Sequence, residues 1–330
     1  LRKCLDSILN QTYKEIELII VNDASKDDSE EIIKEYMNLD DRIKYVRHSK
    51  NRGLFQARIS GAEEATGEYI AFVDSDDYIS CDFYRMLVKK AEDTGADMVL
   101  ADFCLEYEDG KREYYNLDPI RLQDLDLQGE EVLQAFMEQK GLFYSWQLAW
   151  NKLIRKDLWE KCEKDYVEFS KKHGHLIMTE DIAFSCLWWM KASYVVNVHH
   201  IEYFYCKREG QSTDTKNANK LKKNLLDTVA VFEFFKTNLK NVDKYEKYQS
   251  EFEQWLNLYG RINFDNFSAA NLLEEYGEII QNKFFLDNSM SGMSYEDNFF
   301  YSLKTNVADA FEWYEDIKRG IYHKNCDNNF

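Results

Sequence analysis

The chain has 330 residues, of which 60 are Asp or Glu and 42 are Lys or Arg, so its formal net charge is −18 at pH 7. This excess of acid argues against a general nucleic-acid binder, because affinity for phosphate backbones comes mainly from clustered basic side chains. No run approaches the roughly 18 apolar residues of a membrane span, and the opening residues lack the layout of a signal peptide. Seven scattered cysteines, none in a CxxC pair, fit reduced thiols. We therefore expect a cytoplasmic protein, and peripheral association with the inner face of the membrane stays open.

The first hundred residues alternate predicted helices with predicted strands. Apolar residues at helical spacing open the chain, and further helices are indicated from about residue 29 and residue 54. Strands are predicted at 16–21, 43–46 and 69–74. They are apolar on both faces, which is typical of a parallel sheet covered by helices on both sides. The sequence therefore predicts an α/β fold with a Rossmann-like, mostly parallel sheet.

The pattern becomes less regular further along the chain. Four later elements are predicted, and they are a helix at 81–92, a strand at 97–107, and helices at 129–139 and 181–191. From about residue 217, long helical periodicities rich in Phe, Tyr and Leu replace the strands. We therefore divide the chain into an α/β domain, residues 1–215, and a helical C-terminal domain, residues 216–330.

Three carboxylates follow the third predicted strand within four positions, at Asp74, Asp76 and Asp77. Two carboxylates ~4 Å apart repel by about 4 kcal/mol at an effective dielectric of ~20, so a cation or a proton must compensate them. Residues two apart on a strand point the same way, and we expect Asp74 and Asp76 to converge on Mg²⁺ or Mn²⁺ carrying phosphate groups. Asp23, after the first strand, should lie at the same sheet edge. Capping of the next helix by solvated aspartates is the alternative.

Several segments, in this order, resemble a family 2 glycosyltransferase with the A-type fold. They are SILNQTYKEIELIIVNDASKDDS (7–29), NRGLFQARISGAEEATGEYIAFVDSDD (51–77), AWNKLIRKDLW (149–159), TEDIAF (179–184) and YFYCKREGQS (203–212). The resemblance covers about two thirds of the chain and excludes the helical tail. In this family an apolar strand precedes the opening helix, and this sequence has no counterpart of it. A sequence that starts partway into the protein and a donor site that lacks one wall both stay open.

The resemblance implies a role for four residues of the donor site. Asp23 would recognise the nucleobase, usually uracil, and Arg58 would lie near that base or the diphosphate. Asp74 would bind the ribose. Asp76 would coordinate Mn²⁺ or Mg²⁺ between the two phosphates, where the ion neutralises charge on the departing diphosphate.

The resemblance also implies a general base and two supporting cations. Inverting transfer needs a group that takes the proton of the acceptor hydroxyl, and the family pattern points to Asp181, with Glu180 beside it. Both open a predicted helix in which Thr179 is expected to act as N-cap, and a mere improvement of the helix start is the alternative. Lys152 falls in a segment beside the donor and acceptor sites. Arg208 falls in a loop that is expected to close over the diphosphate.

Taken together, the resemblance implies a metal-dependent, inverting transfer of a hexosyl or N-acetylhexosaminyl group from a UDP-sugar. The acceptor would be a hydroxyl of a glycan, a lipid-linked glycan or a protein, in cell-surface polysaccharide synthesis. A non-catalytic sugar-nucleotide-binding or assembly subunit is one alternative. A haloacid-dehalogenase-like phosphatase is another, although Tyr78 stands where that motif requires Thr or Val. The helical tail is left open between acceptor binding and self-association into a homo-oligomer.

Overall fold

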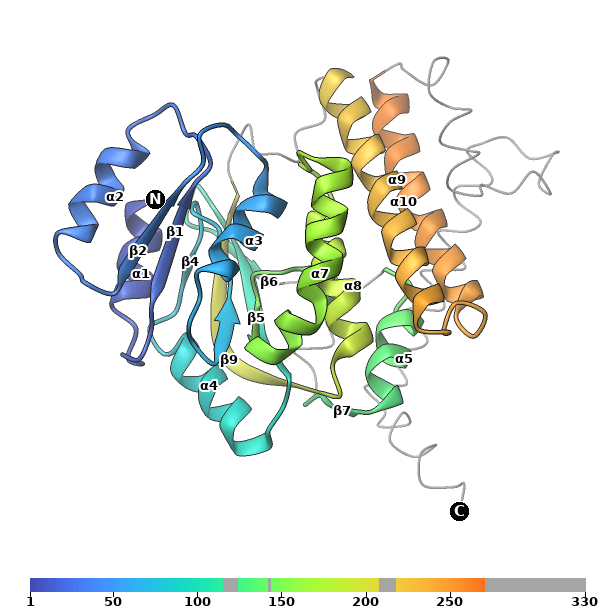
Figure 1. Cartoon of the computed structure of the whole chain (residues 1–330), viewed down its shortest axis with the longest axis horizontal. Helices are drawn as coiled ribbons and strands as arrows, with labels where there is room; N and C mark the ends of the chain where they lie inside the picture. Colours follow the sequence, from blue (N-terminus) through green and yellow to red (C-terminus); the bar gives the residue numbers. More distant parts are fainter. Residues whose placement is uncertain (115–123, 142–143, 208–217, 271–330) are drawn as a thin grey trace.

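The computed structural model describes residues 1–114, 124–141, 144–207 and 218–270 (Figure 1). The helices in these ranges are α1 (Arg2–Leu9), α2 (Ser29–Met37), α3 (Leu54–Glu63), α4 (Phe83–Thr94), α5 (Glu130–Glu138), α6 (Tyr144–Gln147), α7 (Lys156–His173), α8 (Glu180–Lys191), α9 (Ala218–Asn241) and α10 (Gln249–Ala269). The strands are β1 (Leu18–Asn22), β2 (Ile43–Arg47), β3 (Tyr69–Ala71), β4 (Tyr78–Ile79), β5 (Met98–Tyr107), β6 (Arg112–Tyr114), β7 (Asp126–Gln128), β8 (Lys152–Arg155) and β9 (Tyr194–Lys207). Across these ranges no helix is both long and apolar enough to cross a membrane.

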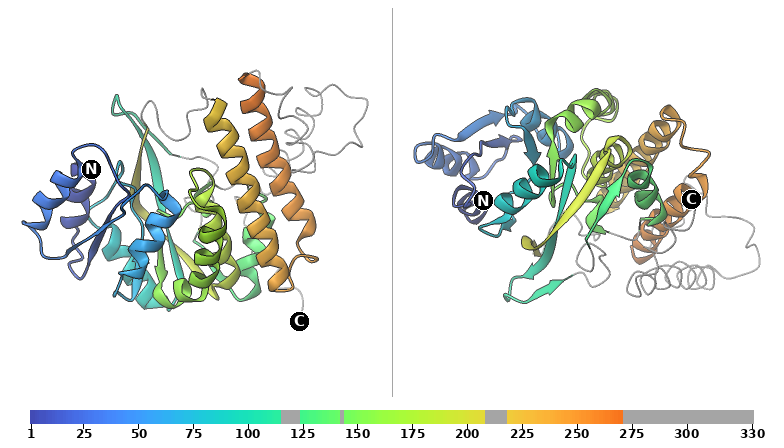
Figure 2. Two further views of the ribbon diagram at one scale, coloured as in Figure 1. Left: turned by 45° about the horizontal axis from the view of Figure 1, so that its top comes forward. Right: turned by 90° about the horizontal axis from the view of Figure 1, so that it is seen from below.

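The strands form two sheets. Strands β1 and β2 pair in parallel, in a register that sets Asn22 opposite Arg47. The larger sheet has seven strands in the order β3-β8-β5-β9-β4, with β6 paired to β5 and β7 paired to β9. Helices cover both faces of this sheet, so the predicted α/β class is confirmed (Figures 1 and 2).

The expected direction of the strands needs correction, because the large sheet is mixed rather than mostly parallel. Strands β5 and β9 are parallel, but β8 runs antiparallel between β3 and β5, and β4, β6 and β7 also pair antiparallel. Strands β3, β5 and β9 consequently share one direction. Apolar residues on both faces of a strand indicate burial by helices, and they carry no information about the direction of its neighbour.

Strand β5 divides its side chains between the two faces of the sheet. Met98 and Leu100 belong to the hydrophobic cluster formed with α3, α5, α7, α8 and α9. Val99 and Ala101 belong to the cluster formed with α1 and α4. Alternate residues of a strand point to opposite faces, so this single strand anchors both helical layers. Figures 1 and 2 show the two layers on either side of the sheet.

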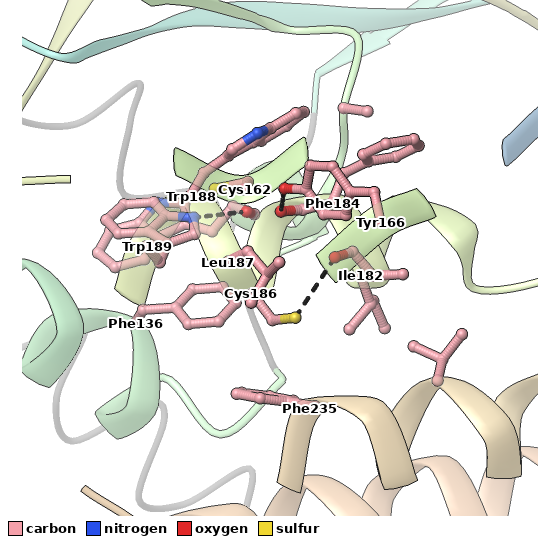
Figure 3. Packing of buried hydrophobic residues seen from close by; sticks show 14 of the residues in the cluster. Phe136, Cys162, Tyr166, Ile182, Phe184, Cys186, Leu187, Trp188, Trp189 and Phe235 are labelled. Atoms are coloured by element: carbon pink, nitrogen blue, oxygen red, sulfur yellow. Dashed lines mark hydrogen bonds between the residues drawn. The ribbon is translucent and has the colours of Figure 1, made fainter. Parts of the chain in front are cut away.

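Helix α8 is the centre of the larger cluster. Its residues are buried without interruption from Ile182 to Trp189 (Figure 3). Two hydrogen bonds fix it to its neighbours, because the Tyr166 hydroxyl donates to the carbonyl of Phe184 at 2.9 Å and the Trp189 indole donates to the carbonyl of Trp146 at 2.9 Å. Each large apolar side chain buried here contributes about 1.5–3 kcal/mol. The start of α8, which carries the predicted base, is therefore held by a packed core.

Helices α9 and α10 share that core with the α/β part of the chain. Phe235 of α9 and Trp255 of α10 lie against Phe136 of α5, with ring centroids 6.0 and 5.1 Å apart. Trp255 is fully buried. The helical character expected after residue 217 is found up to Ala269, and the division of the chain near residue 215 stays a prediction.

Substitution of Gly53 tests the close packing of its backbone against Leu176. Its φ of +88° and ψ of 161° fall in a region that only glycine adopts readily, and an added Cβ would lie 2.8 Å from the carbonyl oxygen of Leu176. Gly95 is a matched control, because its φ is +74° and its Cβ would meet nothing within 4 Å. We expect Gly95→Ala to lower the free energy of unfolding by about 1 kcal/mol and Gly53→Ala to lower it at least twice as much. Urea denaturation measures both, and equal losses would contradict the close approach to Leu176.

Candidate active site

Asp23 holds the loop before α3 in place. It directly follows β1, and its carboxylate accepts hydrogen bonds from the backbone N–H groups of Arg52, at 2.8 and 3.0 Å to its two oxygens, and of Gly53, at 2.7 Å. These amides stand immediately before the first turn of α3, where the helix dipole favours negative charge. The expected nucleobase carboxylate is therefore also an organiser of the NRG loop.

His48 is a neighbour of Asp23 that the sequence analysis missed. Its Nδ1 lies 2.6 Å from Asp23 Oδ1, and its ring is buried. A signal for this contact existed in the sequence, because two parallel strands end at the same edge of a sheet. With Asn22 paired to Arg47, the next residue of each strand is Asp23 and His48.

Arg58 connects carboxylates from two distant parts of the chain. It projects from α3 with a side chain that is 4% exposed. Its Nη2 donates to Asp74 Oδ1 at 2.8 Å, and its Nη1 donates to Asp181 Oδ1 at 2.5 Å and lies 3.6 Å from Glu180 Oε1. The structure therefore brings together Asp74, Glu180 and Asp181 around the guanidinium expected near the donor.

Burial and charge act in opposite directions on the two acids of α8. Burial raises the pKa of the Asp181 carboxyl and of the Glu180 carboxyl, while the adjacent Arg58 guanidinium opposes the rise in both. Lys152 also favours the ionised form of Asp181. Such a balance between desolvation and a specific charge partner is typical of groups that exchange protons in catalysis.

The acidic loop is not the end of a strand, which corrects the expected geometry. Strand β3 ends at Ala71, and the backbone N–H of Asp77 donates to the carbonyl of Asp74 at 3.0 Å, so residues 74–77 form a turn. The argument that Asp74 and Asp76 share one face of a pleated strand was therefore wrong. The pairing of β3 with β8 ends at Ala71.

Asp77 is turned away from this turn into the protein. The backbone N–H of Cys206 donates to its Oδ1 and the hydroxyl of Tyr203 donates to its Oδ2, each at 2.8 Å. The Tyr203 hydroxyl also accepts the N–H of Asp74 at 3.0 Å. Burial, with Asp74 and Asp76 nearby, raises the pKa of Asp77 to about 8. Strand β9 is in this way fastened to the acidic loop.

The repulsion within the acidic cluster is consequently relieved by the chain itself. Arg58 supplies positive charge to Asp74, and burial raises the pKa of Asp77 to about 8, which favours its neutral form. Two members of the cluster are thus compensated by groups of the protein.

Thr179 does not act as the expected cap of α8. It occupies the N-cap position, but its φ is +60° and its hydroxyl donates to the carbonyl of Met178 at 2.6 Å instead of accepting a helix N–H. Local bonding of a threonine hydroxyl competes with capping. The orientation of Glu180 and Asp181 therefore comes from Arg58 and the core beneath α8.

The two remaining predicted cations differ in what can be described. Lys152 is 1% exposed, and its ammonium donates to the carbonyls of Ser145, at 2.7 Å, and Leu148, at 2.5 Å, and to Asn151 Oδ1 at 2.8 Å. It faces protein oxygens and can influence the site through its charge. Arg208 lies outside the described residues.

Helix α3 joins the two halves of the candidate site. Asp23 contacts the backbone just before its first turn, and Arg58, one turn further on, contacts the acidic loop and α8. Asp23 and Asp74 belong to the ends of two different sheets, not to one edge. At one end of the candidate site, Asp23 offers a carboxylate that can accept a hydrogen bond from a nucleobase. At the other end lies the cluster of ionisable groups around Arg58.

Comparisons with known proteins identify relatives of this chain. Residues 1–152 match the family described as glycosyl transferase family 2. EpsH of Bacillus subtilis, a protein assigned to the glycosyltransferases, is 33% identical over 264 residues, which make up 79% of this chain and 72% of EpsH. Glycosyltransferase GlyA of Streptococcus pneumoniae is 36% identical over 166 residues, 50% of this chain and 24% of GlyA.

A solved structure shares the fold at lower sequence identity. The crystal structure of S. aureus TarS 1-349 in complex with UDP-GlcNAc superposes with a TM-score of 0.53 and 19% identity. The match covers 89% of this chain and 88% of that chain, so it extends beyond residue 152. It supports the architecture described above.

Arg58→Met should destabilise the fold markedly. The substitution keeps much of the apolar stem but leaves Asp74 and Asp181, whose side chains are 22% and 21% exposed, without their shared cation. Removing one partner of a buried ion pair costs 3–5 kcal/mol, and we expect about 3 kcal/mol because the carboxylates retain some solvent. Chemical denaturation measures the loss. Arg2→Met, which breaks the exposed pair with Glu35, is the control and should change stability little.

Proposed function

The chain belongs to glycosyltransferase family 2, and we propose that it transfers a sugar from a UDP-sugar to an acceptor hydroxyl with inversion, with a divalent ion bound at Asp76. The observation that carries the proposal is the position of Arg58, which joins a donor-side carboxylate, Asp74, to a carboxylate that can act as a base, Asp181. Membership in this family sets aside the phosphatase alternative.

The proposed donor site extends from Asp23 to the acidic loop. Asp23 would accept the imide N–H of uracil, since its carboxylate is fixed at the start of α3. Asp74 would accept a ribose hydroxyl, and Arg58 would lie close to the diphosphate. A uridine donor is also consistent with the UDP-GlcNAc found in TarS. Whether the sugar is a hexose or an N-acetylhexosamine depends on contacts beyond these residues.

The described residues suit a metal that arrives with its nucleotide. In the described ranges no three His, Cys, Asp or Glu side chains form a metal-holding group. Mg²⁺ is commonly held by one or two carboxylates together with substrate phosphates, so a single half-buried carboxylate at Asp76 fits such an ion. When bound, Mn²⁺ or Mg²⁺ would neutralise negative charge on the leaving diphosphate.

The proposed base is Asp181, supported by Glu180. Asp181 would take the proton of the acceptor hydroxyl as that oxygen attacks the anomeric carbon on the side opposite the diphosphate. Arg58 favours the ionised form of this carboxyl against the effect of burial, and the core under α8 fixes its position. We assign the reaction to the synthesis of a cell-surface polysaccharide, with a glycan or lipid-linked glycan as acceptor.

Two substitutions separate binding from turnover. Asp76→Asn should weaken Mn²⁺-dependent binding of UDP by at least tenfold, because it removes the charged ligand of the ion. Asp181→Asn should leave UDP binding within about twofold and lower the turnover number by at least a hundredfold, the usual contribution of a general base. Calorimetry and a sugar-transfer assay measure the two effects. Unchanged transfer by both variants would contradict the proposal.

The pH profile provides an independent test of Asp181. Its raised pKa means that the base becomes ionised only above the ordinary range of an aspartate, so kcat/KM should fall as pH is lowered through that raised value. Arg58→Gln removes the charge that opposes the rise, and the acid limb should move to higher pH. Arg85→Gln removes an exposed charge on α4 and serves as control. An acid limb at the same pH in wild type and Arg58→Gln would argue against Asp181 as the base.

A further inference from the structure

Asp23 is the end of a chain of side-chain hydrogen bonds that leads into the protein. His48 Nδ1 lies 2.6 Å from Asp23 Oδ1, and His48 Nε2 lies 3.0 Å from Ser60 Oγ. Gln56 Nε2 donates to Ser60 Oγ at 3.3 Å, and the Ser170 hydroxyl donates to Gln56 Oε1 at 2.6 Å. This hydrogen-bond network runs from α7, through two residues of α3 and the residue after β2, to the residue after β1.

The donors and acceptors of this hydrogen-bond network are all satisfied when every donor points along the network toward Asp23. Because Gln56 Oε1 accepts from Ser170, its amide nitrogen faces Ser60 and donates to the hydroxyl oxygen. The Ser60 hydroxyl proton is then available to His48 Nε2. A neutral histidine that accepts at Nε2 carries its hydrogen on Nδ1, where it points at Asp23.

Three members of this hydrogen-bond network are shielded from water. His48, Ser60 and Ser170 are each 7% exposed, while Asp23 at its outer end is 17% exposed. Hydrogen bonds in such surroundings strengthen one another, and an unpaired member would be costly. The network therefore fixes the rotation of the Asp23 carboxylate more firmly than the two loop amides alone.

The same contacts limit what Asp23 can still bind. An ionised carboxylate offers about four lone-pair positions. His48, Arg52 and Gly53 use both oxygens, and the Arg52 amide is shared between them. About one acceptor position remains. The imide N–H of uracil is a single donor and suits it, whereas guanine presents two adjacent donors and cytosine presents an acceptor at N3.

We propose that His48 is the positioning residue for nucleobase recognition, and that it orients Asp23 so that one acceptor position faces a uracil imide. This inference rests on the uridine donor proposed above and adds the residue that sets its selectivity. His48 acts through Asp23 and does not touch the nucleotide.

The test compares UDP with CDP, each bound in the presence of Mn²⁺ and followed by calorimetry. Loss of a hydrogen bond to a charged group should weaken UDP binding by roughly tenfold in His48→Ala, with little change for CDP. His48→Asn places an amide N–H near the position of Nδ1 and should restore most of the UDP preference. His48→Gln places it near Nε2 and should not.

Two controls separate positioning from general damage. Mn²⁺ with inorganic pyrophosphate is a probe without a base, and its binding should be equal in wild type and all three variants. The Asn and Gln variants differ by one methylene, so their comparison remains informative even where the Ala variant unfolds. Ser170→Ala, at the far end of the network, should reduce the preference for UDP by less than His48→Ala.

The outcomes distinguish this inference from the proposed function. A preference for UDP over CDP that survives in folded His48→Ala or His48→Gln overturns the role of His48 and leaves the donor proposal standing. Equal loss of UDP and pyrophosphate binding also overturns it, since it indicates structural damage. If the wild-type protein does not prefer UDP over CDP, the proposed uridine donor is overturned. The role of His48 in nucleobase recognition is then overturned as well.

Discussion

The guanidinium of Arg58 is the charge around which the acidic site is organised. Carboxylates from the loop after β3 and from the start of α8 meet around this buried cation. It reaches both from a helix that is itself buried against the core. The charge that pairs these carboxylates also favours the ionised form of the proposed base, so a substitution at Arg58 should change stability and chemistry together.

Helix α3 translates this local interaction into an arrangement of the whole site. Its N-terminus meets Asp23, its second turn carries Arg58, and Gln56 and Ser60 on the same helix join the network that leads to His48. Strand β9 supports the opposite side through Tyr203 and Cys206, which hold Asp77 and the acidic loop. A rigid helix that meets Asp23 at its N-terminus and carries Arg58 near its middle is a precise support for a nucleotide, because rigid elements hold functional groups better than loops do.

The sequence predicted the class of fold, most element positions and the residues that meet around Arg58. Apolar periodicity reports burial and therefore predicted the elements, whereas Arg58, Glu180 and Asp181 were named because their motifs resemble a known family. The sequence failed on strand direction, on the turn at residues 74–77 and on the cap at Thr179. These features depend on which groups meet in the folded protein. The Thr179 hydroxyl bonds to the backbone, and the Asp77 carboxyl bonds to β9. His48 was predictable from the parallel register, but the network that continues from it through Ser60 and Gln56 to Ser170 of α7 joins residues far apart in sequence.

The absence of a side chain at Gly53 lets the NRG loop rest directly on the backbone at Leu176, a few residues before α8. The segment that would read the base and the segment that leads to the proposed proton acceptor are thus in steric contact. Replacing the NRG loop to change which nucleotide is accepted would therefore create steric clashes with the segment before α8. Such clashes would be avoided only if residues 174–178 were exchanged as well. Changes in donor specificity should therefore be accompanied by changes in turnover.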